Sequence, residues 1–193
     1  MIQKALLTTI AMLSLSASSF ATPQAPDKLI YKGKLFNLFA NPLEAFYKGD
    51  KSKPEFMIEP RTWFSGNQRG YVATWEVRDD FLYLVEIDSW ICEPPSSDNC
   101  KRADLKELFG ERYQDGRVKA MWFSGELRMP EGKVLQYVHV GYVSLYERDT
   151  ILTVESGKIV DAKVIDNTKK PIPPIEELER QEVERMKKRG EWP

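Results

Sequence analysis

Apolar and polar residues alternate over two adjacent stretches in the middle of the chain, residues 71–77 and 81–88. A period of two is typical of a half-buried β-strand. The second stretch is rich in β-branched and aromatic residues, which indicates another strand. The Asp79-Asp80 step between them predicts a hairpin. The apolar face of the first strand consists of Tyr71, Ala73, Trp75 and Val77.

The length of the loop at this hairpin decides which residues lie opposite each other. A two-residue loop places Trp75 opposite Leu84, whereas a three-residue loop places it opposite Tyr83. Because the step contains no glycine to select a turn type, the sequence leaves both registers open.

Further strands are expected on both sides of the hairpin. Residues 28–39 alternate loosely around a glycine and predict either a strand pair or a strand followed by a helical turn. Residues 117–129 predict a strand, residues 130–133 a turn, and residues 134–146 a long strand. Two short apolar stretches predict a last hairpin around Ser156-Gly157: residues 151–154 and 158–165.

Helical signals occur at three places. Asn41 and Pro42 suit the N-cap and first position of a helical turn, and residues 103–110 read as a short helix that ends at Gly110. Residues 175–190 predict a longer helix that is acidic at its start and basic at its end, as the helix dipole favours. We expect this helix either to rest on the domain, or to dock on a partner or on a second copy of the chain, the last giving a homodimer. Its thin apolar stripe consists of Ile175, Leu178, Val183 and Met186.

Two short motifs occur twice in the chain. Trp63-Phe64-Ser65-Gly66 recurs as residues 122–125, and residues 70–76 resemble residues 141–147. Recurrence of this kind predicts a duplicated structural unit. The alternative is convergent local patterning, since the alignment requires gaps. The expected fold is therefore dominated by β-structure: an antiparallel β-barrel or sandwich with a pseudo-repeat, one or two short helices and a charged C-terminal helix.

The N-terminus resembles a secretory signal. Lys4 is followed by an apolar stretch and then by small residues that suit cleavage after Ala21. The predicted organisation is a signal peptide over residues 1–21, a single β domain over 22–170, and a proline-rich linker with the helix over 171–193. We expect a periplasmic or secreted protein that does not insert into the membrane after cleavage. A net charge of −1 argues against nucleic acid as a partner.

Cys92 and Cys100 flank a polar loop rich in turn-forming residues. Because disulfides persist in exported compartments, we expect these two cysteines to form one. We expect no metal and no cofactor, because the single histidine, His139, lies far along the chain from the cysteines. In the predicted 134–146 strand His139 is expected to be a core or edge residue bonded to the backbone. The disulfide loop either holds a local shape or presents itself to a partner together with the nearby Trp90.

Acidic residues give the only catalytic hypothesis. Glu76 and Glu147 occupy matching positions in the two copies, and Glu86 adds a carboxylate on the neighbouring strand. If the copies pack about a two-fold axis, Glu76 and Glu147 are expected to approach each other, and a carboxylate pair can hydrolyse glycosides. The competing interpretation is that they are solvent-face residues paired with Arg78 and Arg148.

Residues 70–77, 82–84, 108–110 and 122–127 resemble a loosely defined set of uncharacterised exported bacterial proteins. The resemblance spans residues 64–165, implies no known activity and identifies no functional residue. We therefore expect a non-catalytic exported domain that binds a protein or glycan, such as an inhibitor or immunity-type protein. The alternatives are a carboxylate-dependent glycan hydrolase and a passive structural component of the envelope.

Overall fold

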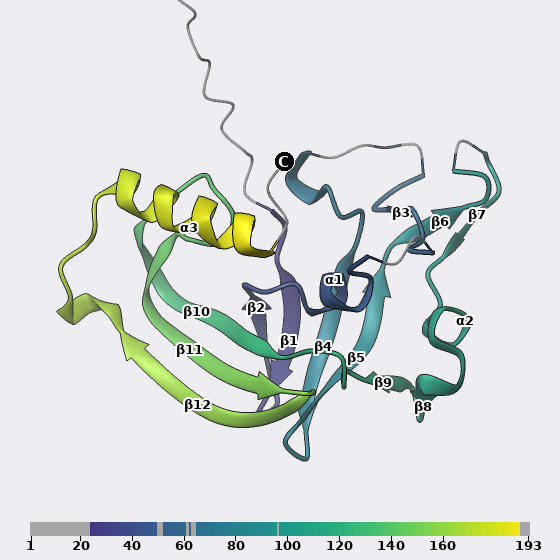
Figure 1. Cartoon of the computed structure of the whole chain (residues 1–193), viewed down its shortest axis with the longest axis horizontal. Helices are drawn as coiled ribbons and strands as arrows, with labels where there is room; N and C mark the ends of the chain where they lie inside the picture. The colour runs from purple at the N-terminus through teal and green to yellow at the C-terminus, as the bar shows by residue number, and fades with distance from the viewer. Residues whose placement is uncertain (1–23, 50–51, 61, 63–64, 96, 190–193) are drawn as a thin grey trace, which may run out of the picture.

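The computed structural model describes residues 24–49, 52–60, 62, 65–95 and 97–189. Strands outweigh helices in these residues, so the predicted sheet-dominated class with short helices and a charged C-terminal helix is confirmed (Figure 1). The α-helices are α1 (Pro42–Phe46), α2 (Leu105–Phe109) and α3 (Ile175–Arg189), and the 3-10 turns are η1 (Ser65–Asn67), η2 (Gly110–Arg112) and η3 (Asn167–Lys169). The strands are β1 (Asp27–Tyr31), β2 (Lys34–Leu38), β3 (Phe56–Met57), β4 (Val72–Arg78), β5 (Phe81–Asp88), β6 (Trp90–Cys92), β7 (Cys100–Arg102), β8 (Tyr113–Gln114), β9 (Arg117–Lys119), β10 (Gly125–Gln136), β11 (Leu145–Glu155) and β12 (Lys158–Asp166).

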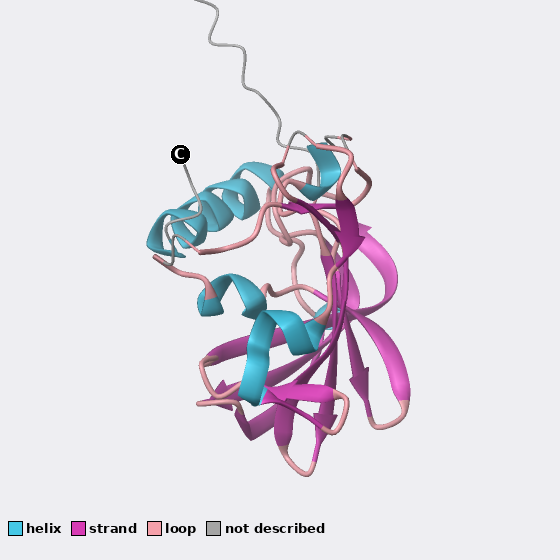
Figure 2. Ribbon diagram, turned by 90° about the vertical axis from the view of Figure 1, so that its right-hand side faces the viewer, coloured by secondary structure: helices cyan, strands magenta, loops and turns pink. Residues whose placement is uncertain are grey.

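The large sheet runs in the order β10-β11-β12-β5-β4-β1-β2, and β8 and β9 extend from β5. It is a mixed sheet rather than the expected antiparallel one, because β1 and β4 are parallel, with Leu29 opposite Trp75. The sheet curls until Phe39, just after β2, donates a backbone hydrogen bond of 2.7 Å to the carbonyl of Arg128 in β10. A second sheet, β3-β6-β7, lies beside it, and Figure 2 shows the helices gathered on one side of the strands. The architecture is therefore a strongly curled open sheet in place of the closed barrel or sandwich.

The central hairpin follows the alternation in the sequence. Arg78 pairs with Phe81, so the loop has two residues and Trp75 lies opposite Leu84. Asp79 and Asp80 both have positive φ angles, 50° and 61°, a conformation that aspartate tolerates better than most residues do. The predicted inward face is confirmed, because Tyr71, Ala73 and Trp75 are fully buried. Other fully buried members of this core are Leu29, Leu38, Leu82, Leu84, Val118, Leu127, Met129 and Leu152.

The strand boundaries predicted for residues 117–146 are wrong. The chain turns at Ala120–Phe123, where the Phe123 amide donates to the Ala120 carbonyl at 3.0 Å, and β10 then runs straight through the predicted turn at 130–133. Pro130 is compatible with this strand because β10 lies at the edge of the sheet, where a missing N–H does not break a ladder. A bulge after Glu131 accommodates the glycine at 132.

The predicted strand over 134–146 ends at Gln136, and residues 137–144 form a loop. The alternating valines of this segment, Val138 and Val140, pack with Val143 and with Leu178 of α3. Contact with a helix, rather than a sheet face, therefore explains the apolar pattern. His139 is exposed in this loop, with its ring edge-on to Tyr137 at 4.7 Å, rather than lying in a core strand.

The two motif copies do not form equivalent units. Arg78-Asp79 lies at the end of β4 and in its hairpin turn, whereas Arg148-Asp149 lies in the middle of β11 and pairs with both neighbouring strands. Trp63 and Phe64 of the first tetrapeptide lie outside the described residues, and its second copy forms the turn after β9. Local patterning therefore explains the recurrence.

The helix α3 forms as predicted and rests on the domain through Leu178, which is 7% exposed. Of its expected apolar stripe, Ile175 is 43% exposed, Val183 is half-buried, and the side chain of Met186 lies outside the described residues. Among the described helices, none has the length and apolar character required to cross a membrane. The predicted signal peptide, residues 1–21, lies outside the described residues.

Candidate functional site

The carboxylates of the catalytic hypothesis lie in separate environments. Glu76 contacts Arg117 at 3.4 Å and Arg78 at 3.5 Å. Glu147 instead accepts a hydrogen bond of 3.1 Å from the backbone amide of Lys133 in the bulge of β10. Because β4 and β11 are separated in the sheet by β5 and β12, the structure does not bring Glu76 and Glu147 together as the two-fold packing required.

Glu86 lies on a different surface, in a polar cleft of about 480 Å³ between the end of β5 and the α2–β8 region. Its carboxylate lies at the limit of hydrogen-bonding distance, 3.5 Å, from the Thr74 hydroxyl. The remaining acidic residues of the cleft are Asp88 and Asp104, which is also the N-cap of α2 and accepts from the amide of Glu107. The cleft therefore holds three carboxylates and one guanidinium, that of Arg102.

Trp90 lies beside this cleft on β6 and is half-buried. The guanidinium carbon of Arg102, on the neighbouring strand β7, lies 4.6 Å from the centre of the indole ring, a cation–π geometry. The same guanidinium makes a 2.6 Å ion pair with Asp88 at the end of β5. Together Glu86, Asp88, Trp90, Arg102 and Asp104 form a continuous surface, called the hairpin face below.

The predicted disulfide is present and supports this face. Cys92 and Cys100 lie opposite each other on β6 and β7, with Cα atoms 4.0 Å apart. The loop between them closes on itself, because the Glu93 amide donates to the Asn99 carbonyl at 3.1 Å and the Ser97 amide donates to the Pro94 carbonyl at 2.8 Å. A bond of this type is usually found in an oxidising, extracellular compartment.

Ser89 joins the small sheet to the large one. This fully buried residue lies between β5 and β6, and its hydroxyl donates to the Gly70 carbonyl at 2.8 Å and accepts from the Met57 amide at 3.2 Å. The β6–β7 hairpin that carries this face is therefore attached to the core through Ser89 at one end and bridged by the disulfide at the other.

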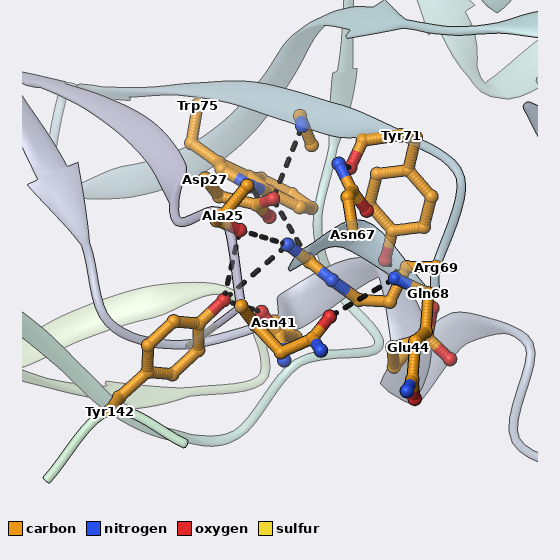
Figure 3. Close-up of polar contacts among 12 residues, drawn as sticks. Ala25, Asp27, Asn41, Glu44, Asn67, Gln68, Arg69, Tyr71, Trp75 and Tyr142 are labelled. Atoms are coloured by element: carbon orange, nitrogen blue, oxygen red, sulfur yellow. Dashed lines mark hydrogen bonds and ion pairs between the residues drawn. The ribbon is translucent and has the colours of Figure 1, made fainter. Parts of the chain in front are cut away.

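A second group of polar side chains, from fully to half-buried, joins the 65–71 segment to β1, α1 and Tyr142 (Figure 3). Asp27 is fully buried, and its carboxylate accepts from Arg69 at 2.9 Å, from the indole of Trp75 at 3.0 Å and from the Ala73 amide at 3.2 Å. Arg69 also donates to the Ala25 carbonyl at 2.6 Å. We call this group, with Glu44, Tyr71 and Tyr142, the Asp27 network.

Two tyrosines extend the Asp27 network to α1. The Tyr71 hydroxyl donates to Glu44 at 2.8 Å, and the Tyr142 hydroxyl donates to the side-chain carbonyl of Asn41 at 3.0 Å. Asn41 precedes α1 as predicted, but its side chain takes the Tyr142 hydrogen bond instead of capping the helix.

Burial is the largest influence on the pKa values of Asp27, Arg69 and Tyr71. It raises the pKa of Asp27, and the positive charge of Arg69 with the hydrogen bonds from Trp75 and Ala73 opposes that rise only in part. For Arg69, burial is the largest influence and lowers the pKa, but the charge and hydrogen bond of Asp27 together with the nearby Tyr142 and Tyr71 outweigh it, so the net shift is upward. Burial, reinforced by the nearby charge of Asp27, raises the pKa of Tyr71 well above its usual range.

The Asp27 network stabilises the fold rather than forming a binding site. Both carboxylate oxygens of Asp27 accept hydrogen bonds from other groups of the protein. No member of the network lines the polar cleft or the smaller cleft described below. The sequence analysis identifies neither Asp27 nor Arg69, because neither residue belongs to a recognised motif. The available signal was that Asp27 is in phase with Leu29 and Tyr31 on β1 and so faces inward.

The raised pKa of Tyr71 predicts a loss of stability at alkaline pH. The Tyr71 phenol ionises near pH 10 in the unfolded chain but stays neutral in the folded protein. The contribution of Tyr71 to the free energy of unfolding is therefore complete below about pH 10 and falls by about 1.4 kcal/mol per pH unit above that pH. Urea unfolding at several alkaline pH values measures this slope. Tyr71→Phe should have a shallower slope, while Tyr137→Phe, at a tyrosine that is 52% exposed, should match the wild type. Equal slopes in all three proteins would contradict the prediction.

The fold and these surfaces define a sheet-dominated domain with a disulfide-bridged hairpin. No group of three or more metal-ligating side chains occurs among the residues that the structure describes. Comparison of the chain with protein-family models, with curated proteins and with solved structures found no match. The hypothesis about function therefore depends on the geometry alone.

Proposed function

We propose that this protein is an exported, non-catalytic binding domain that recognises a protein partner through the hairpin face. The observation that carries the proposal is the juxtaposition of Trp90 and Arg102 with a polar cleft of about 480 Å³ on a disulfide-bridged support. Tryptophan and arginine are the residue types most enriched among the energetically dominant residues of protein interfaces.

The rigidity of the hairpin face supports a binding role. Binding costs less when the surface is already in its bound conformation, because fewer side chains and loops must be ordered. Here the disulfide bridges the strands at one end, and Ser89 fixes the other end to Gly70 and Met57. Binding residues commonly lie on segments that such a fixed support positions.

The charge of the face indicates the chemistry of the partner. Asp88 is already paired with Arg102, so Glu86 and Asp104 give the cleft its excess of negative charge. An excess of this sign favours a partner segment that carries lysine or arginine, which would also be attracted to the indole of Trp90. The proposed partner is therefore a protein with an exposed basic segment, as expected for an inhibitor or immunity-type interaction.

The carboxylate-dependent hydrolase is the weaker proposal. It relied on the approach of Glu76 and Glu147, and the two side chains instead engage Arg117 and the Lys133 amide on strands that are not neighbours. Glu86 remains in a cleft, but its neighbours there form the binding surface just described.

Capture of partners from an envelope extract tests the proposal. The wild-type protein, Trp90→Ala and Glu86→Lys are immobilised, and the bound proteins are compared by mass spectrometry. Loss of Trp90 or reversal of the Glu86 charge should release the specific partner, with a drop in affinity of roughly tenfold or more, because each removes a central contact.

Glu155→Lys is the matched control, because it makes the same charge change on an exposed strand residue outside the hairpin face. It should retain the partner that the two test variants lose. If Trp90→Ala and Glu86→Lys retain every protein that the wild type captures, the hairpin face is not the binding surface.

A further inference from the structure

A second cleft, of about 310 Å³, opens where β12 stays paired with β11 but separates from β5. β12 pairs with β5 only at Lys158, and the curl of the sheet brings the β1–β2 hairpin opposite β11 and β12. The walls are mainly apolar and the rim is basic. The residues that line this lysine-rimmed cleft include Tyr31, Phe36, Ala162, Val164, Lys32 and Lys34, together with Thr150, whose hydroxyl donates to Glu131 at 2.9 Å.

The apolar walls continue the face that forms the core. Tyr31 is in phase with fully buried Leu29 on β1, and Ala162 lies opposite fully buried Leu152 on β11. Beyond the core this face is left uncovered, so Val164 is 68% exposed. Apolar surface that is concave and rimmed by polar residues is one of the features that mark ligand-binding grooves.

The positive charge of the rim is not neutralised from within the cleft. Lys32 and Lys34 lie at and beside the turn of the β1–β2 hairpin, and among the described residues no carboxylate pairs with either ammonium group. Lys32 lies 5.0 Å from the centre of the Tyr31 ring. Lys163 also borders the cleft, but its ammonium group is paired with Glu126 at 3.2 Å.

We propose that the lysine-rimmed cleft binds an anionic amphiphile with a single aliphatic chain, of the fatty carboxylate class. The chain would lie against Phe36, Ala162 and Val164, and the carboxylate would contact Lys34 and Lys32. The volume of the cleft is at the lower end of the range for small-molecule sites, which suits one chain rather than a branched or polycyclic ligand. The site shares no residue with the hairpin face, so the two proposals stand independently.

Calorimetric titration of the purified protein with dodecanoate below its micelle concentration tests the site. Affinity should rise from acetate through octanoate to dodecanoate, by about fourfold for each methylene that enters the cleft. The cation dodecyltrimethylammonium, with the same chain, should bind roughly tenfold more weakly or not at all, because it meets two unpaired lysines.

Two pairs of variants locate the binding. Lys34→Glu should weaken dodecanoate roughly tenfold, whereas Lys28→Glu, on the opposite face of the same hairpin, should leave it unchanged. Val164→Asp should also weaken binding, whereas Val160→Asp, at another exposed residue of β12 that lies outside the cleft, should not. All four positions are on the surface or at its margin, and circular dichroism confirms that each variant is folded.

Three results would overturn the proposal. They are the absence of dodecanoate binding, equal binding of the anionic and cationic amphiphiles, and equal affinities across the four variants. The second and third indicate adsorption to the surface at large rather than occupation of the lysine-rimmed cleft.

Discussion

Asp27→Ala is expected to lower the free energy of unfolding by about 3–5 kcal/mol, the range measured when one partner of a buried ion pair is removed. The substitution leaves the Arg69 guanidinium, whose side chain is 10% exposed, without its carboxylate. It also removes the acceptor of the Trp75 indole and the Ala73 amide, which are both in the core. Urea unfolding followed by tryptophan fluorescence measures the loss.

Asp88→Ala provides the matched control. Asp88 forms a shorter ion pair with Arg102, 2.6 Å, but both side chains are about 60% exposed. Water screens this pair, so its loss should cost less than about 1 kcal/mol. Similar losses for Asp27→Ala and Asp88→Ala would show that the Asp27 network does not hold the fold together.

Gly70→Ala is expected to lower the free energy of unfolding by more than about 3 kcal/mol. A β-carbon at this position would lie 1.7 Å from the carbonyl oxygen of Phe56, so the backbone of β3 or of the 65–71 segment must move. Hydrogen bonds fix both segments to other parts of the fold. The Gly70 carbonyl accepts from Ser89 and Arg69 donates to Asp27, while Met57 of β3 donates to Ser89. Thermal unfolding of the variant measures the effect.

Gly33→Ala distinguishes the cost of the steric clash at Gly70 from the cost of placing alanine at a positive φ angle. Gly33 has the same φ angle as Gly70, +74°, but no atom lies within 4 Å of its added β-carbon. Its substitution should cost only the left-handed strain of about 1–2 kcal/mol. If Gly70→Ala costs no more than Gly33→Ala, the close approach of Phe56 to Gly70 is not a constraint on the fold.

The parts of the fold that the sequence predicts correctly depend on local signals. The β4–β5 hairpin, the Cys92–Cys100 disulfide and the helix α3 each lie within a short stretch of chain. The register of the hairpin required the structure, because two aspartates in a turn are compatible with more than one loop length. The apolar alternation fixed which face of β4 is buried, and Trp75 is fully buried as expected.

The incorrect predictions depended on contacts between distant segments. Alternation at Val138 and Val140 indicated a strand, but these side chains pack against Leu178 of a helix far along the chain. Pro130 indicated a turn, but the strand that contains it lies at a sheet edge, where proline is tolerated. Neither the position of a strand in its sheet nor the partner of a valine can be read from a local pattern.

The candidate site was predictable to a similar extent. Trp90 and the two cysteines were identified from the sequence, because an aromatic residue next to a disulfide loop is a local feature. The pairing of Arg102 with Asp88 was not predictable, since it depends on the register between β6 and β7 and on where β5 ends. The Asp27–Arg69 pair joins residues 42 positions apart, so it required the parallel pairing of β1 with β4.

The central claim is that the hairpin face binds a basic segment of a partner, and the indole resonances of the protein test it most directly. In a titration with tetralysine monitored by nuclear magnetic resonance, the indole signal of Trp90 should shift saturably, whereas tetraglutamate should leave it in place. The indoles of Trp75 and Trp122, which donate to Asp27 and to the Pro42 carbonyl, should not respond to either peptide. A Trp90 signal that ignores tetralysine, or that responds equally to both peptides, would contradict the account.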